Sequence, residues 1–125
     1  MDGILTPDTA VELSKKAGSN LLSHKYTKEV ANRVALFVEE ICLTILDENC
    51  NAKKPVLIEL SLLFEADSVL VIERDSGQLF DLTDSDSQIN GLSRFVLNGL
   101  MASHQEKAYL VTTGYNRNMI RFSQK

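Results

Sequence analysis

Apolar residues recur at helical spacing in two stretches near the start of the chain. The first stretch begins at Thr6-Pro7-Asp8, where Thr6 suits a helix cap and Pro7 the first helical position, and continues to about residue 23. The second follows Thr27 as N-cap and ends near Glu48. The apolar stripes are Val11, Leu13, Ala17, Leu21 and Leu22 in the first, and Val30, Val34, Phe37, Val38, Ile41, Cys42, Ile45 and Leu46 in the second. We therefore expect two helices, the second long and amphipathic, whose apolar face packs on another layer.

Strand character dominates after residue 55. Residues 56–64 and 68–73 are rich in aliphatic residues and are separated by a short polar connection, which predicts an antiparallel hairpin. A third helix is expected to open at Asn90-Gly91, after a polar loop at residues 83–88. Two closing strands are expected at 108–112 and 119–122, with a turn at Gly114-Tyr115-Asn116 between them. This order predicts an α/β (α+β) two-layer sandwich, in which helices cover one face of a mixed, mostly antiparallel sheet.

The composition fits one soluble domain. The 125 residues suffice for a single core, which we divide into an N-terminal helix with its connection (1–26) and a core (27–125). Lys and Arg number 13 against 17 Asp and Glu, a net charge of −4 that argues against nonspecific nucleic-acid binding. No apolar run is long enough for a membrane span, and the acidic start does not fit a secretory signal, so we expect a cytoplasmic protein. Cys42, Cys50, His24 and His104 lack metal-site spacing.

Three short polar motifs punctuate the expected elements. Asp75-Ser76-Gly77 follows the second strand of the hairpin, where a carboxylate offers a hydrogen-bond acceptor at a strand end, although Asp and Gly are also common in ordinary turns. Glu40 and Thr44 lie one turn apart on the long helix, on a face that equally fits a solvated surface. Gly91 opens the third helix, where backbone N–H groups and the helix dipole favour an anion, and Asn90 fits a plain N-cap there.

Together, these motifs and their order resemble the histidine-kinase-like ATPase superfamily, which includes sensor histidine kinases, gyrase and heat-shock chaperones. The resemblance is greatest to the compact bacterial branch of anti-sigma-factor serine kinases and spans residues 27–122. The family's glutamate pair and asparagine read here Glu39-Glu40 and Thr44, so that threonine replaces the asparagine. Phe80-Asp81 also matches this branch, with Leu79 in place of its proline.

The resemblance implies roles for eight residues in binding ATP and magnesium. It makes Glu40 the general base and Thr44 a magnesium ligand. It implies that Asp75 accepts a hydrogen bond from the adenine amino group and that Gly77 lets the backbone approach the base. The phosphates would meet the start of the third helix, formed by Gly91, Leu92, Ser93 and Arg94, where Ser93 replaces a family glycine.

Two functions of different classes follow. The first is an adenine-nucleotide-binding regulatory domain, with weak or lost ATPase or serine-protein-kinase activity toward a regulatory protein partner. The second is a noncatalytic protein-interaction module that keeps the fold without binding nucleotide, favoured by the loss of the asparagine at Thr44, of the glycine at Ser93, and of length between Asp81 and Asn90. The resemblance also allows a homodimer, since anti-sigma kinases often dimerise.

Overall fold

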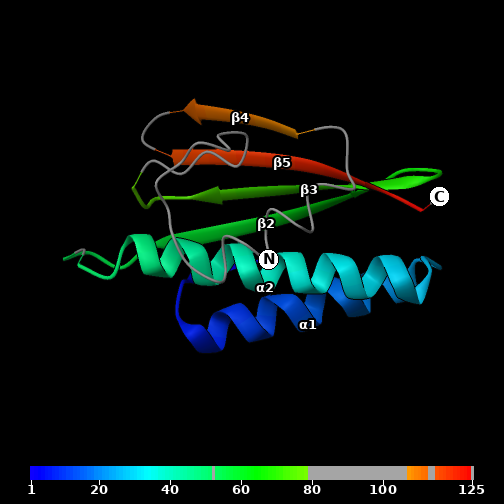
Figure 1. The fold of residues 1–125 in the computed structure, drawn as a ribbon, viewed down its shortest axis with the longest axis horizontal. Coiled ribbons are helices and arrows are strands. Elements are labelled where there is room, and N and C mark those ends of the chain that lie inside the picture. Colours follow the sequence, from blue (N-terminus) through cyan, green and yellow to red (C-terminus); the bar gives the residue numbers. More distant parts are fainter. Residues whose placement is uncertain (52, 79–106, 113–114, 125) are drawn as a thin grey trace.

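Two helices and a five-stranded sheet form two layers (Figure 1). The computed structural model describes residues 1–51, 53–78, 107–112 and 115–124. The elements are β1 (Asp2–Ile4), α1 (Pro7–Ser23), α2 (Lys28–Glu48), β2 (Leu57–Phe64), β3 (Ser68–Asp75), β4 (Lys107–Thr112) and β5 (Tyr115–Ser123). The sheet order is β1-β2-β3-β5-β4, and these strands pair antiparallel throughout. The expected α/β sandwich is confirmed, while the parallel part of a mixed sheet is not seen among the described strands.

Both helices begin where the sequence places them. Thr6 caps α1 by accepting a hydrogen bond from the Thr9 N–H, and Pro7 occupies the first turn, where no N–H is needed. Thr27 caps α2 in the same way by accepting from the Val30 N–H. Each cap satisfies one of the N–H groups that a helix start leaves unpaired, so these positions fix the helix boundaries.

The core lies between α1, α2 and one face of the sheet. The apolar stripe of α2 is buried as expected, except for Leu46, which is partly buried. Phe37 packs edge-on against Phe122 of β5 with ring centroids 5.3 Å apart. On α1 the buried face is Ala10, Leu13, Ala17 and Leu21. Val11 and Leu22, which we expected in that stripe, are 43% and 47% exposed. Each directly follows a buried residue in the sequence, so its side chain points away from the narrow face that the helix packs against its neighbour.

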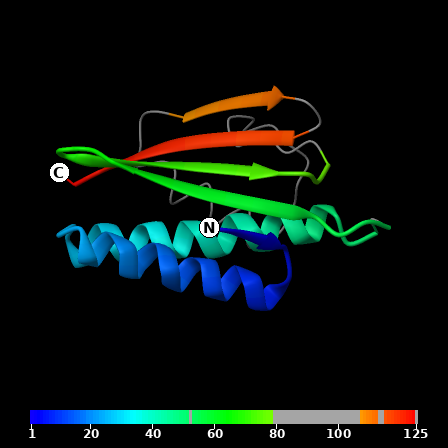
Figure 2. The same ribbon diagram turned by 180° about the vertical axis from the view of Figure 1, so that it is seen from behind.

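Contacts at both ends hold α2 against the β2–β3 hairpin. Just before α2, the Tyr26 hydroxyl lies 2.9 Å from the Glu65 carbonyl oxygen and 2.7 Å from that of Ser68, at the hairpin turn. Just after α2, Asn49 Oδ1 accepts a hydrogen bond from the Gln78 N–H at 2.9 Å. The helix therefore runs along the sheet with its two ends tied to the two ends of β3, as both ribbon views show (Figures 1 and 2).

Two features of the sheet differ from the sequence prediction. Strand β1 was not expected; it adds to the edge of β2 with Gly3 opposite Ile58 (Figure 2). The turn predicted at Gly114-Tyr115-Asn116 is wrong for its last two residues, because Tyr115 and Asn116 already belong to β5 and pair with Thr112 and Val111. Strand β5 is thereby long enough to run alongside the whole of β3.

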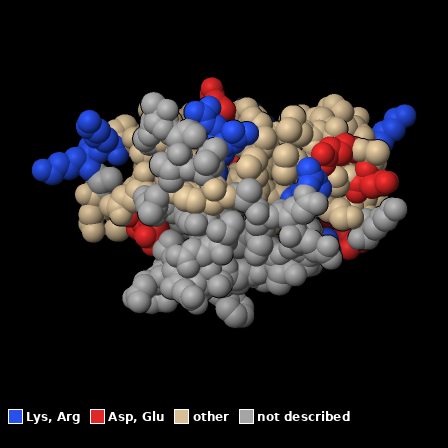
Figure 3. Space-filling model, turned by 90° about the horizontal axis from the view of Figure 1, so that it is seen from above, with Lys and Arg blue, Asp and Glu red and all other residues tan. Residues whose placement is uncertain are grey.

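Charged side chains of both signs are interspersed on the described surface shown in Figure 3. The exposed ion pairs are Lys16–Glu12, Arg33–Glu29, Arg74–Glu59 and Arg121–Glu65. Pairs of this kind contribute at most about 1 kcal/mol each. Among the described residues, neither helix is both long and apolar enough to cross a lipid bilayer.

Candidate functional site

The inner face of the sheet changes from apolar to polar along β3 and β5. Alternate residues of a strand share a face, so the inward row of β3 reads Val69, Val71, Glu73, Asp75, and that of β5 reads Phe122, Ile120, Asn118, Asn116. The antiparallel register sets Glu73 opposite Asn118 and Asp75 opposite Asn116. All four polar side chains are at most 3% exposed. Two acids and two amides thus form a buried polar cluster at one end of the core.

Hydrogen bonds connect the members of this cluster across the strands. Asn118 Nδ2 donates to Glu73 Oε1 at 3.0 Å, and Asn116 Nδ2 donates to Asp75 Oδ1 at 3.0 Å. Asn116 Oδ1 accepts from the Tyr109 hydroxyl of β4 at 2.6 Å. Since a carboxylate can only accept and an amide N–H₂ can only donate, each acid–amide pair has one possible polarity. The cluster is therefore built from three adjacent strands with defined donors and acceptors.

Asp75 also organises the turn that follows β3. Its Oδ1 accepts from the Gly77 N–H at 2.9 Å, which closes a side-chain turn of the kind that favours aspartate. Ser76 is tied to β2 by two bonds, Leu57 N–H to Ser76 Oγ at 2.8 Å and Ser76 N–H to the Leu57 carbonyl oxygen at 3.0 Å. Asp75 Oδ1 thus holds two N–H donors, one from the turn and one from Asn116.

Gly77 lies against the end of α2. A Cβ added there would fall 2.7 Å from Asn49 Nδ2, closer than real side chains approach. Asn49 cannot simply give way, because its Nδ2 donates to the Ile45 carbonyl oxygen and its Oδ1 accepts from Gln78. The close approach that requires glycine in this structure is therefore to Asn49, and the approach to an adenine ring stays a prediction.

Each acid keeps one oxygen without a donor from the described residues, Glu73 Oε2 and Asp75 Oδ2. Burial, then the contact and charge of the neighbouring Asp75 carboxyl group, raise the pKa of Glu73 well above its ordinary value, and the bond from Asn118 opposes this only in part. Burial and the neighbouring Asp75 thus favour the protonated form of Glu73 over the ionised one. Asp75 Oδ2 is the buried acceptor that a ligand would find in this cluster.

One residue of α2, Cys42, lies near the cluster from the other layer. Burial chiefly, then the charges of Glu73, Asp75 and Glu39, raise the pKa of the Cys42 thiol far above its ordinary range. Cys42 is therefore an unreactive thiol that packs as a small apolar side chain. Cys50 is exposed, in line with its expected position past the helix end.

Glu40 and Thr44 do not assemble a cation site with the other described residues. Thr44 is 1% exposed, and its hydroxyl donates to the Glu40 carbonyl oxygen at 2.7 Å, a bond within the helix. The Glu40 side chain is half-buried. Among the residues that the structure describes, no group of three or more His, Cys, Asp or Glu side chains is arranged to hold a metal ion. The magnesium role of Thr44 and the general-base role of Glu40 stay predictions.

The expected phosphate motif, Gly91, Leu92, Ser93 and Arg94, lies outside the described residues, as do the expected third helix, the polar loop, Phe80 and Asp81. Their roles stay predictions. Sequence reasoning missed Glu73, Asn116 and Asn118. The signal was present as polar residues at 73, 75, 116 and 118, because a period of two brings all four to one face once the strands are paired.

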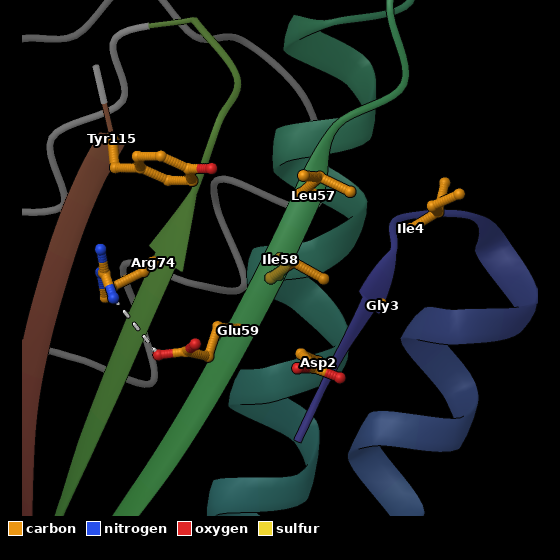
Figure 4. Close-up of a pocket in the computed structure, with 8 residues that line it drawn as sticks. All are labelled: Asp2, Gly3, Ile4, Leu57, Ile58, Glu59, Arg74 and Tyr115. Atoms are coloured by element: carbon orange, nitrogen blue, oxygen red, sulfur yellow. Dashed lines mark ion pairs between the residues drawn. The ribbon is translucent and has the colours of Figure 1, made fainter. Parts of the chain in front are cut away.

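Two hollows open near these elements. One, of about 630 Å³, flanks the turn after β3 and is lined by Asn49, Lys53, Lys54, Pro55, Val56, Leu57, Ser76, Gly77 and Gln78. The other, of about 410 Å³, involves β1, β2, β3 and β5 and includes Leu57, Arg74 and Tyr115 (Figure 4). Tyr115 there lies under the Arg74 guanidinium, whose central carbon is 5.4 Å from the centroid of the tyrosine ring. Asp75 lines neither of these two hollows.

Comparison with known proteins gives a similarity of fold. No family model and no curated protein matches the chain. Among solved structures, the histidine kinase domain from the Erythrobacter litoralis EL346 blue-light activated histidine kinase is similar, with a TM-score of 0.58 and 16% sequence identity. The match covers 78% of this chain but 46% of that chain, so this protein spans under half of that structure. At this identity the similarity concerns the fold alone: the chain has a fold of the histidine-kinase type.

Proposed function

We propose that this chain is an adenine-nucleotide-binding regulatory domain whose catalytic activity is weak or lost. One observation carries the proposal. Asp75 is fully buried at the end of β3, its Oδ1 is fixed by the Gly77 N–H and by Asn116, and its Oδ2 has no donor from the described residues. Native structures rarely leave such an oxygen without a partner, so each instance calls for a specific cause. A ligand N–H group is one cause, and because Oδ2 has two lone pairs it can accept such a group even beside a donor from the protein. The resemblance to the histidine-kinase-like ATPases gives this aspartate the adenine amino group.

The chemistry of this acceptor favours adenine over guanine. The adenine amino group donates a hydrogen bond, whereas guanine has a carbonyl oxygen at the equivalent position. A carbonyl oxygen placed against a buried carboxylate would leave two acceptors facing each other, and an unsatisfied buried group costs about 1–3 kcal/mol. Asp75 therefore supplies selectivity as well as affinity.

The same burial sets an expectation of weak binding. Asp75 has no exposed surface, so a nucleotide reaches Oδ2 only after local opening around it. When the conformation that can bind the ligand is only a small fraction of the protein, the measured affinity is reduced by that fraction. We also expect little or no phosphoryl transfer, because Thr44 replaces the family asparagine and its buried hydroxyl is turned to the backbone carbonyl oxygen of Glu40 within the helix. If a phosphoryl group is transferred, Glu40 is the proposed base and a serine of a regulatory protein the proposed acceptor.

Calorimetric titration with ATP, with and without magnesium, tests the proposal in wild type and in Asp75→Asn. This substitution keeps an oxygen for Gly77 and Asn116 but replaces the free acceptor by an amide donor. We expect weak binding that is lost in Asp75→Asn and kept in Glu59→Gln, an exposed carboxylate on β2. Turnover of roughly 1 per second or more, as in ordinary kinases, would contradict the expected loss of catalysis.

The second candidate is a protein-interaction module that keeps this fold without a nucleotide. It is favoured because two of the site residues already contact other residues of this chain. The Thr44 hydroxyl donates to the Glu40 carbonyl oxygen, and the Asn49 side chain occupies the space next to Gly77. Under this alternative, neither ATP nor ADP gives a heat signal at millimolar concentration, and Asp75→Asn changes stability alone. Absence of binding in folded wild-type protein would therefore decide for the interaction module.

A further inference from the structure

Two carboxyl groups lie next to each other in the buried polar cluster. Glu73 and Asp75 are two residues apart on β3, so both side chains leave the same face of the sheet. Glu73 is 1% exposed and Asp75 is 0% exposed. One oxygen of each is held by the asparagine opposite, while Glu73 Oε2 and Asp75 Oδ2 have no donor from the described residues. The two carboxyl groups are in side-chain contact, and two carboxyl oxygens can form a hydrogen bond with each other only through a proton.

The described groups around this pair provide no positive charge. Cys42 faces it from α2, with Glu39 close enough to act on the Cys42 thiol, and the Tyr109 hydroxyl and the two asparagine amides belong to β4 and β5. No ion pair joins either carboxyl group to a lysine or arginine in the described part of the chain. Two ionised carboxylates side by side, away from water, would repel each other strongly, and one proton removes this repulsion.

We propose that Glu73 keeps one proton at neutral pH and donates it to Asp75, so that Glu73 acts as a positioning residue for the nucleotide acceptor. The second part of this inference rests on the proposed function. The pair then carries a single negative charge, located on Asp75. Glu73 belongs to none of the motifs recognised in the sequence.

The arrangement of donors decides which acid holds the proton. Asp75 Oδ1 accepts from two N–H groups, those of Gly77 and Asn116, and hydrogen bonds to the charged form favour ionisation. Glu73 accepts from Asn118 alone. The raised pKa of Glu73, caused by burial and by Asp75, agrees with this assignment. The proton therefore belongs to Glu73, and the negative charge to Asp75.

This arrangement leaves Asp75 able to bind a ligand. A carboxylate oxygen has two lone pairs, so Oδ2 can accept the Glu73 O–H and a ligand N–H together. The Glu73 O–H fixes the carboxylate plane, and it keeps Asp75 ionised without a second anion beside it. Removing this donor would leave one oxygen of a buried carboxylate without a protein partner, which costs free energy and leaves the carboxylate plane less firmly held.

Carbon-13 NMR of the full chain with labelled glutamate side chains tests the proton directly, without any nucleotide. We expect one glutamate carboxyl signal to stay at the protonated position at about pH 7, well above the ordinary glutamate pKa of about 4.3. This signal should disappear in Glu73→Gln. If every glutamate signal shows an ionised carboxylate at that pH, proton sharing is refuted.

Calorimetric titration with ADP then tests the positioning role in two variants of similar volume. Gln can donate to Asp75 Oδ2 as the protonated acid does, whereas Leu cannot. We expect Glu73→Gln to bind ADP at least about tenfold more tightly than Glu73→Leu, since hydrogen bonds to charged groups commonly exceed that value. Equal affinities, or tighter binding by the Leu variant, would refute the positioning role. If folded wild type binds no ADP, the proposed function and this role fail together, and the NMR result alone decides whether the proton is shared.

Discussion

Replacing Glu73 by glutamine should change how the stability of the protein depends on pH. The substitution keeps the size of the side chain and an N–H donor for Asp75, but removes the only proton that Glu73 can lose. Glu73 is 1% exposed and its pKa is raised well above the ordinary value of 4.5 by burial and by Asp75. The folded chain therefore holds this proton over a pH range in which the unfolded chain releases it.

The sign of the effect follows from this difference in bound protons. A raised folded-state pKa gives a contribution to stability that is complete below the unfolded pKa of 4.5 and is lost as pH rises toward the folded pKa. Within that window the contribution of Glu73 falls by up to about 1.4 kcal/mol for each pH unit, the free energy of one proton. The Gln variant lacks this loss. Its stability relative to wild type should therefore increase steadily with pH.

Urea denaturation followed by circular dichroism, at pH values from about 4.5 to 8, gives the free energies of unfolding. The quantity to plot is the difference between Glu73→Gln and wild type, because other titrating groups cancel in it. Glu59→Gln is the matched control: its carboxylate is exposed on the opposite face of the sheet, paired with Arg74 at 3.5 Å. We expect a slope approaching one proton for Glu73→Gln and almost none for the control. A flat or decreasing difference for Glu73→Gln would refute our assignment of the proton.

Three further predictions concern the surroundings of the cluster. Gly77→Ala should destabilise the protein by about 1–3 kcal/mol, because the new Cβ would lie 2.7 Å from Asn49 Nδ2; unchanged urea midpoints would show that Asn49 moves aside freely. Phe122→Ala should cost about 3–5 kcal/mol in the same assay, as a fully buried ring that contacts α2 is lost, and a cost under about 1 kcal/mol would contradict this packing. In native protein, Cys50 should react quickly with an aromatic disulfide reagent and Cys42 only on unfolding, because burial raises the pKa of Cys42 and hides its sulfur; two fast thiols would contradict the structure.

The helices and the hairpin could be predicted because their signals are local. Helical periodicity and the caps Thr6 and Thr27 define both helices, and two aliphatic runs with a short polar connection define β2 and β3. Strand β1 could not be predicted in this way. It has only three residues, two of them exposed, and exists because β2 offers a free edge. Tyr115 and Asn116 look like turn residues beside Gly114, but pairing with β3 extends β5 through them.

Only the site residues that lie close together in the sequence and form a motif could be predicted. Asp75 and Gly77 are two residues apart and form a recognisable turn, and the structure indeed joins them by a hydrogen bond. Glu73 read as an ordinary strand residue, because its partner Asn118 lies 45 positions away in the sequence. Only the register of β3 against β5 shows that polar residues on two strands meet on the buried face. Sites assembled by long-range pairing carry no local signal.

The buried polar cluster at the end of the inner sheet face can serve either the fold or a ligand. A buried polar network in which every group has a partner can serve the fold alone, whereas a partly satisfied one is less stable than an apolar core. Here the asparagines satisfy one oxygen of each acid, and a proton between Glu73 and Asp75 satisfies the other two. What then remains is one lone pair on Asp75 Oδ2, held in a fixed plane by three donors. A purely architectural cluster has no need of an ionised aspartate at this position, since asparagine would close the same turn without a buried charge. The negative charge that we propose for Asp75 is therefore the feature that separates a ligand site from structural polarity. The Asp75→Asn variant tests it: a gain in stability together with a loss of nucleotide binding is the combination that a ligand site requires.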